Sequence, residues 1–364
     1  MASLSKSPGG LNVLTIDGGC LEGVAPLVIL HSLLDTFAQE RSLEAAKVHP
    51  CDVFDLICGI GSGGWLALML GRFRMDIPTA LEEWEALLNG ITPSTHDKMA
   101  LMQLVQNRCY KLERLVHKVE ELAGRYKTGV YMHMPNSDGI RCSHVFVAVV
   151  NAEPRKDGSK QYHLLRTYQT TEKYGGSAEY DEHHWKLANA FAATGAMKAF
   201  TGPWEERLDG KTKLKFFDDQ FPHPHNISEL AVDEVYALYG KKTPISVVVN
   251  IGPGMPRPAD VKLITHRFSL NDHVFNKEEK QKTFLNEGRV LEEQVVRKLQ
   301  NMYGADESLY YRLAPVNAEE FRGFGDSSRV ERVTKQTNIW LSHGEVKAKV
   351  HEVSTQLTYS GTLS

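Results

Sequence analysis

The residues best placed to do chemistry form a run of glycines, Gly59-Ile60-Gly61-Ser62-Gly63-Gly64. An apolar run, 52–58, precedes these glycines, and a second apolar run, 65–71, follows them. This order predicts a buried strand, a sharp turn and a helix that ends at Gly71. Glycines at such a turn permit positive φ angles and a close approach of the backbone to a ligand.

One interpretation of this turn is a nucleophile elbow, G-x-S-x-G, which holds a serine on a strained strand-to-helix turn. Aligned on its flanking glycines, the elbow runs from Gly59 to Gly63. Gly61 then occupies the apex where the nucleophile should stand, and glycine has no side chain that can attack a substrate. Ser62 comes one residue later, and a single step around a tight turn directs its side chain away from the apex.

The alternative interpretation is a dinucleotide-binding turn, G-x-G-x-x-G, which Gly59, Gly61 and Gly64 match. In such a turn the glycines let a pyrophosphate approach the N-terminus of the following helix. The motif requires a second strand soon after that helix, with an acidic residue about 20 positions further on. Residues 81–88 have the pattern of another helix instead. The context therefore argues against nucleotide binding.

A second glycine loop lies close to the N-terminus. Residues 11–16 predict a strand, the segment 17–23 (Asp-Gly-Gly-Cys-Leu-Glu-Gly) follows, and 24–40 predicts a helix with Pro26 in its first turn. Both glycine loops should open on the carboxyl edge of one sheet, where α/β proteins form their sites. A glycine loop at a helix N-terminus presents backbone N–H groups, which suits an anion such as an oxyanion.

Composition excludes several classes of function. The 364 residues fit one large domain or two small ones, and a net charge of −3 does not indicate a nucleic-acid surface. The five cysteines form no C-x-x-C pair, which favours a reducing compartment, and we expect a cytoplasmic protein. The N-terminus lacks the apolar segment of a signal peptide, and no run approaches membrane-spanning length.

These features resemble the patatin-like family of lipid acyl hydrolases, in particular its fungal type. That family has an oxyanion loop of pattern D-G-G-G-x-R-G and a serine in G-T-S-T-G-G. The resemblance continues in residues 54–57 before the elbow, in 69–75 after it and in the late strand 308–313. It also includes the small apolar segment 185–200, although Met197 stands where the family has proline.

The resemblance implies a three-layer α/β fold, with a central, mostly parallel sheet and helices on both faces. It covers about residues 11–315 in colinear order. We therefore divide the chain into an N-terminal tail (1–10), a patatin-like domain (11–315) and a helical C-terminal extension packed on that domain (316–364).

The resemblance also implies acyl transfer by a serine–aspartate dyad, with the aspartate as general base and the glycine loop stabilising the oxyanion. On this match Gly18, Gly19 and Cys20 form the oxyanion-hole-like loop. Asp219 aligns with the catalytic aspartate, and Asp218 is the runner-up.

Four residues depart from the family pattern. Gly61 replaces the serine and Cys20 the third loop glycine, while Glu22 replaces the loop arginine and Gln220 the glycine after the aspartate. A carboxylate beside a developing oxyanion opposes its charge, by a few kcal/mol at an effective dielectric constant of roughly 20. Loss of one oxyanion donor lowers the rate by about 10²–10³, and loss of the nucleophile lowers it further.

Three hypotheses follow. We expect a hydrolytically impaired module that binds a lipid-like or acyl ligand, or a protein partner in signalling. The first alternative is an active acyl hydrolase or acyltransferase that uses Ser62 with Asp219. The second is a pocket reassigned to other chemistry, with Cys20 and Glu22 as candidates.

Each candidate also has a purely structural interpretation. Ser62 can cap a helix, Cys20 can be an inert buried residue, and Asp219 can hold a loop through backbone N–H groups. His223 and His225 lack a third ligand at a helpful spacing. We therefore expect no metal site and no cofactor.

Overall fold

The computed structural model describes residues 10–18, 24–91, 111–133, 144–153, 156, 160–168, 185–197, 201–207, 213–218, 226–240, 243–252, 277–303, 309–315 and 328–359. Several predicted site residues lie outside these ranges, namely Gly19, Cys20, Glu22, Asp219, Gln220, His223 and His225.

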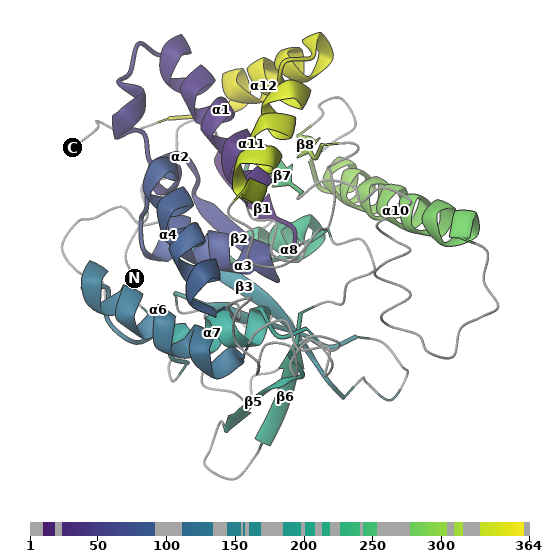
Figure 1. The fold of residues 1–364 in the computed structure, drawn as a ribbon. Coiled ribbons are helices and arrows are strands. Elements are labelled where there is room, and N and C mark those ends of the chain that lie inside the picture. Colours follow the sequence, from purple (N-terminus) through teal and green to yellow (C-terminus); the bar gives the residue numbers. More distant parts are fainter. Residues whose placement is uncertain are drawn as a thin grey trace.

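The centre of the fold is one sheet, in which the described residues contribute eight strands (Figure 1). Their bounds are β1 Leu11–Ile16, β2 Leu56–Ile60, β3 His144–Asn151, β4 Tyr162–Arg166, β5 Trp204–Arg207, β6 Lys213–Phe217, β7 Ile245–Ile251 and β8 Tyr310–Leu313. The strand order is β5-β6-β3-β2-β1-β7-β8, and β4 also pairs with β3. Five neighbouring strands in this order, β3, β2, β1, β7 and β8, are parallel to one another, whereas β4, β5 and β6 form antiparallel pairs. The predicted mostly parallel sheet is confirmed.

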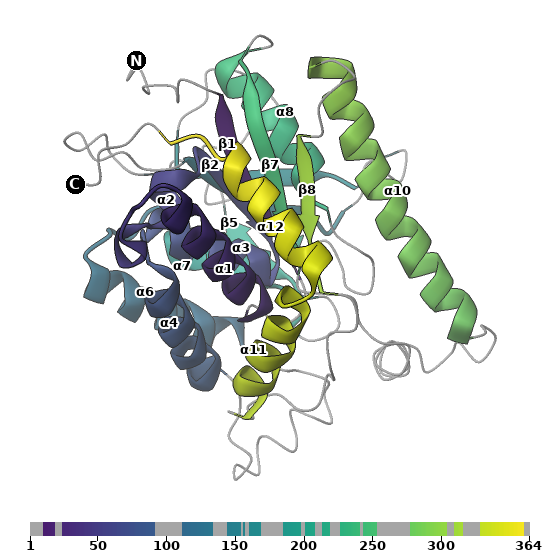
Figure 2. The same cartoon turned by 90° about the horizontal axis from the view of Figure 1, so that it is seen from above.

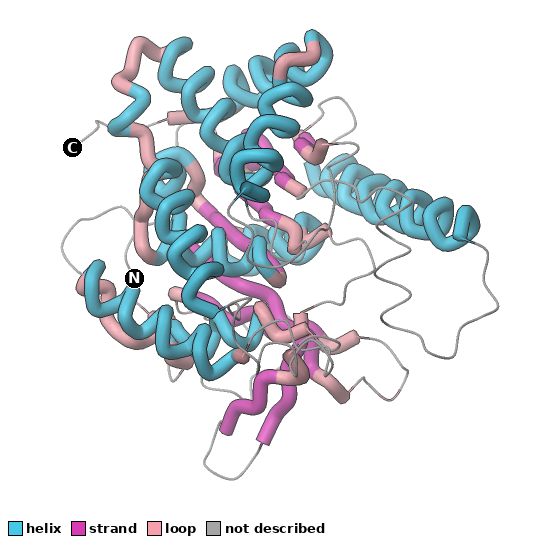
Figure 3. Tube along the Cα trace, in the orientation of Figure 1, coloured by secondary structure: helices cyan, strands magenta, loops and turns pink. Residues whose placement is uncertain are grey.

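The helices surround this sheet (Figure 3). Their bounds are α1 Val24–Glu40, α2 Pro50–Val53, α3 Ser62–Ala67, α4 Ile77–Ile91, α6 Leu112–Tyr126, α7 Leu187–Thr194, α8 Ser228–Tyr239, α10 Lys277–Tyr303, α11 Ser328–Leu341 and α12 Gly344–Gln356. Among the described helices, none combines the length and the apolar character that a membrane crossing requires.

Helices cover both faces of the sheet because the central strands are apolar on both sides. On β1, Val13 belongs to a buried apolar cluster that includes residues of α8 and α10, whereas the next residue, Leu14, belongs to a second cluster that includes residues of α1, α3 and α4. Figure 2 shows α8 and α10 on one side of β1 and β7, and α1 and α12 on the other. The predicted three-layer α/β architecture is therefore confirmed.

The C-terminal helices pack on α1 and close the end of β1. The Arg41 guanidinium at the end of α1 donates to the carbonyl oxygens of Ser354 (3.2 Å) and Leu357 (2.7 Å). The Asn12 amide on β1 donates to the Thr358 carbonyl oxygen at 2.7 Å. The last described segment thus contributes hydrogen bonds to the first strand.

The helix after the elbow does not end at Gly71. The backbone passes from α3 into a π-helical turn, Leu68–Arg72, and Gly71 lies inside that turn. A Cβ atom at Gly71 would lie 2.3 Å from Cγ2 of Val145 on β3. Glycine is present here because the helix packs closely on the sheet, and not because it ends the helix.

Candidate functional site

The strand–turn–helix unit forms as the glycine spacing predicts. Strand β2 ends at Ile60 and α3 begins at Ser62, so Gly61 alone makes the turn. Gly61 has φ 60° and ψ −133°, a conformation that residues with a Cβ atom rarely adopt. The backbone therefore has the strained geometry of a nucleophile elbow, with a glycine at its apex.

The other elbow glycines permit backbone packing that side chains would prevent. A Cβ atom at Gly59 would lie 2.1 Å from the Gly63 carbonyl oxygen, and one at Gly63 would lie 2.2 Å from the Ile16 carbonyl oxygen. One at Gly64 would lie 2.6 Å from Oγ1 of Thr194. Because Gly63 lacks a Cβ atom, the start of α3 packs directly against the backbone of Ile16 and Asp17, where the first glycine loop starts.

Thr194, the last residue of α7, fixes the apex. The Gly61 N–H donates to Thr194 Oγ1 at 3.0 Å, and this hydroxyl donates to the Ala148 carbonyl oxygen of β3 at 3.1 Å. Both hydrogen bonds are buried, so the Thr194 side chain connects the turn to the central strand β3. Sequence analysis did not identify this role, although it noted the small apolar segment that contains Thr194.

Asp218 is the carboxylate that lies beside the apex. It follows β6, is 6% exposed, and its N–H donates to the Ala196 carbonyl oxygen at 2.8 Å. A Cβ atom at Gly61 would lie 3.5 Å from Asp218 Oδ2 and 3.3 Å from the Gly18 Cα. A serine hydroxyl at this position would thus lie between the first glycine loop and the Asp218 carboxylate, within hydrogen-bond reach of the latter. The structure brings together Gly18, Gly61 and the runner-up aspartate; the first choice, Asp219, lies outside the described residues.

Ser62 is 9% exposed and is the first residue of α3. Gly61, and not Ser62, occupies the N-cap position. The serine is therefore adjacent to the apex but does not stand on it.

A buried ionic network holds the start of the first glycine loop. Asp17 directly follows β1, and its Oδ2 atom lies 2.5 Å from the Arg312 Nη1 atom of β8. Asp17 Oδ1 accepts hydrogen bonds from the Asn250 amide (3.1 Å) and from the Ile227 N–H (3.3 Å). The Arg312 guanidinium also donates to the Asn250 side-chain oxygen. Strands β7 and β8 and the N-cap residue of α8 thus converge on one carboxylate, a role that no local sequence pattern marked.

The same hydrogen-bond network extends from Asn250 to Thr15 on β1 and to Ser228 at the start of α8. The Asn250 amide donates to Thr15 Oγ1 at 2.9 Å, and Thr15 shares a 2.8 Å hydrogen bond with Ser228. Burial lowers the pKa of Arg312, but Asp17, Tyr310 and Glu292 together raise that pKa above its ordinary value. Arg312 therefore stays charged and keeps Asp17 paired.

The described residues combine a buried carboxylate (Asp218), the start of the first glycine loop (Asp17 and Gly18) and a strained elbow (Gly61). These are the parts that position a general base and an oxyanion site for acyl transfer. The attacking side chain itself is missing at the apex, since residue 61 is glycine.

No family model matches the chain. Among curated proteins it is similar to calcium-independent phospholipase A2-gamma of Mus musculus, with 37% identity over 272 residues, and to the Rattus norvegicus protein of that name, with 25% identity over 272 residues. Each match includes 73% of this chain and 31% of the relative, so the chain spans about a third of the length of these relatives. Phospholipase A I of Arabidopsis thaliana is 35% identical over 79 residues, which are 21% of this chain and 5% of that protein. At this modest identity, the similarities support a relationship between this chain and the patatin-like phospholipases.

Proposed function

We propose that this chain is a patatin-like acyl hydrolase module that has lost its nucleophile, and that it binds an ester-bearing lipid without hydrolysing it efficiently. The observation that carries the proposal is the elbow with Gly61 at its apex, whose missing Cβ atom would lie 3.5 Å from Asp218 Oδ2. This geometry supports a serine–aspartate site in which the serine alone has been lost.

The loss of a serine nucleophile is known to lower the rate of hydrolysis greatly. Removing the serine nucleophile of a serine protease lowers kcat by about 10⁶, and the remaining rate comes from the oxyanion site and from binding. Elements of the frame that do not depend on the nucleophile are present here. They include the Thr194 hydrogen bond to the apex and the ion pair between Asp17 and Arg312.

The ligand class follows from the relatives and from the charge at the site. The relatives are named as phospholipases, which act on phospholipid esters. A buried carboxylate beside the apex disfavours the anionic head of a free fatty acid and favours a neutral ester group. We therefore propose an intact phospholipid, or a similar acyl ester, as the ligand.

Fluorophosphonate labelling with intact-mass detection tests the proposal, because this probe reacts with activated serine hydroxyls. The natural chain should gain no mass, and the Ser62→Ala variant should behave in the same way. If the natural chain is labelled and Ser62→Ala removes the label, Ser62 is an active nucleophile and the proposal fails.

A further inference from the structure

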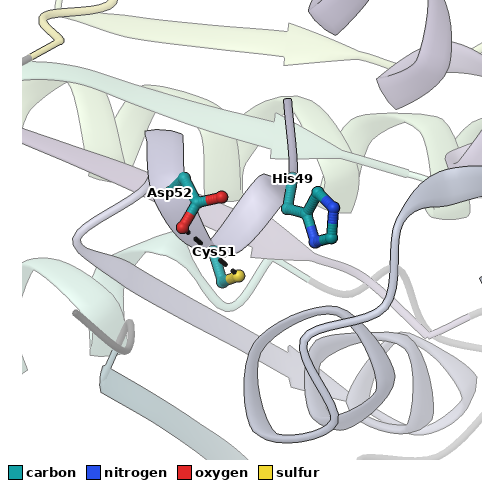
Figure 4. Close-up of side chains that lie close together, drawn as sticks. All are labelled: His49, Cys51 and Asp52. Atoms are coloured by element: carbon teal, nitrogen blue, oxygen red, sulfur yellow. Dashed lines mark hydrogen bonds between the residues drawn. The ribbon is translucent and has the colours of Figure 1, made fainter. Parts of the chain in front are cut away.

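Three side chains whose types can bind a metal ion lie close together in the segment before β2. His49 directly precedes α2, and Cys51 and Asp52 belong to that helix. One ligand atom from each residue, a ring nitrogen, the thiol sulfur and a carboxylate oxygen, lies within 4.8 Å of the other two (Figure 4). This group is separate from the elbow, because β2 runs from Leu56 to Ile60 between Asp52 and the apex.

The local backbone holds these side chains together. His49 is extended, with φ −92° and ψ 146°, and Pro50 opens the helical turn that carries Cys51 and Asp52. The proline ring restricts φ at this position. The spacing of the donors is therefore set mainly by four consecutive residues, and Arg74 contacts both His49 and Asp52.

The donor set suits zinc. Imidazole, thiolate and carboxylate are its usual protein ligands, at about 2.0–2.3 Å. Tetrahedral geometry at these bond lengths places ligand atoms about 3.4–3.7 Å apart. The side chains must therefore approach one another by about 1 Å, which rotation about their χ angles can supply.

The three side chains differ in exposure and in their hydrogen-bond partners. Cys51 is 1% exposed, whereas the Asp52 side chain is 28% exposed, so a metal would enter from the solvent side. The His49 Nδ1 atom lies 3.1 Å from the Arg74 carbonyl oxygen, a partner that would fix the tautomer and leave the other ring nitrogen to bind metal. Asp52 Oδ1 accepts from the Arg74 guanidinium at 3.2 Å and from the Cys51 thiol at 4.0 Å (Figure 4). Coordination through Oδ2 would keep the Arg74 contact and would replace the thiol hydrogen bond, with the Arg74 charge as a competing cation nearby.

We propose that His49, Cys51 and Asp52 bind a thiophilic divalent cation, zinc in the first instance, with water as the fourth ligand. Coordination converts the Cys51 thiol to a thiolate and releases its proton to solvent. A soft thiolate ligand favours zinc over magnesium or calcium. The site is independent of the proposed lipid-binding function, and sequence analysis expected no metal here.

Cobalt(II) titration of the reduced 364-residue chain tests the proposal, since a cobalt–thiolate bond gives a near-ultraviolet charge-transfer absorption that nitrogen and oxygen ligands do not give. We expect this absorption in the natural chain, its loss when zinc is added, and its absence in Cys51→Ser. The matched control is Cys58→Ser, because Cys58 is buried on β2 with its thiol on the Leu14 carbonyl oxygen. This control should keep the absorption.

Two further variants keep the test decisive if Cys51→Ser folds poorly. Asp52→Asn removes the charge of a direct ligand and should weaken cobalt binding by at least about 10–100-fold, since loss of a group that merely supports a ligand already has an effect of this size. Arg74→Gln should tighten it, because it removes the competing charge. An absent thiolate absorption in the natural chain, or one that survives Cys51→Ser, would overturn the proposal.

Discussion

Replacing Gly61 by serine should restore a nucleophile and should also destabilise the fold. A residue with a Cβ atom held at φ 60° and ψ −133° costs about 1–3 kcal/mol. The new Cβ atom would also lie 3.3 Å from the Gly18 Cα, so the first glycine loop must shift by a few tenths of an ångström. We expect the free energy of unfolding to fall by about 2–4 kcal/mol, the upper part of this range reflecting the crowding at Gly18.

Urea unfolding of three variants separates these contributions. Gly61→Ala has the same backbone strain and contact but no hydroxyl, so its loss should equal that of Gly61→Ser. Gly240→Ala is the control for strain alone, because Gly240 has φ 81° and a Cβ atom there would meet nothing within 4 Å. It should lose about 1–3 kcal/mol.

Fluorophosphonate labelling measures whether the Gly61 variants have gained a reactive serine. Gly61→Ser should be labelled, Gly61→Ala should not, and adding Asp218→Asn to Gly61→Ser should slow labelling by about 10²–10⁴ if Asp218 is the general base. A folded Gly61→Ser variant that is as stable as the natural chain would refute the conformational argument. One that folds but stays unlabelled would refute the view that the frame around the apex is intact.

Three other perturbations test the supporting structure. Asp17→Asn should lower the free energy of unfolding by about 3 kcal/mol in urea, because among the described residues it leaves Glu292, at 3.0 Å, as the anionic partner of Arg312. The exposed-pair control Glu293→Gln should cost under about 1 kcal/mol. Thr194→Val should cost about 1–3 kcal/mol, since it leaves the Gly61 N–H and the Ala148 carbonyl oxygen without this partner, and Thr194→Ser should retain most of the stability. Burial lowers the pKa of His144 to about 4, with Glu234 opposing that shift, so the unfolded chain binds the extra proton between about pH 6.5 and 4. Stability should therefore fall by up to about 3 kcal/mol as pH drops through this window, and His144→Phe should flatten that part of the pH profile; an unchanged profile would contradict the assignment.

Local patterns were sufficient to predict the frame of the site. The strand at 11–16 and the helix at 24–40 have the predicted bounds, because the glycines at 9–10 and 18–23 separate two apolar runs. The spacing of the glycines likewise placed Gly61 at the apex, which the positive φ angle of this residue supports. Gly71 misled the prediction, since glycine serves close packing as well as helix termination.

Side-chain partners at long range could not be predicted in this way. Two adjacent carboxylates, Asp218 and Asp219, follow β6, and a shift of one position in the match to the family changes which of them aligns with the catalytic aspartate. The structure places Asp218 beside the apex, and Asp219 lies outside the described residues. Thr194 is 133 positions from Gly61, and Arg312 is 295 positions from Asp17. No local pattern marks such pairs, because they arise only when strands and helices assemble.

The most direct test of the central claim measures binding and ester cleavage in the same sample. The natural chain is titrated with a fluorescent phospholipid, and released fatty acid is quantified after prolonged incubation. The proposed function predicts saturable binding with no release above that of buffer, and release that appears in Gly61→Ser. Rapid release by the natural chain, abolished by Ser62→Ala, would contradict it.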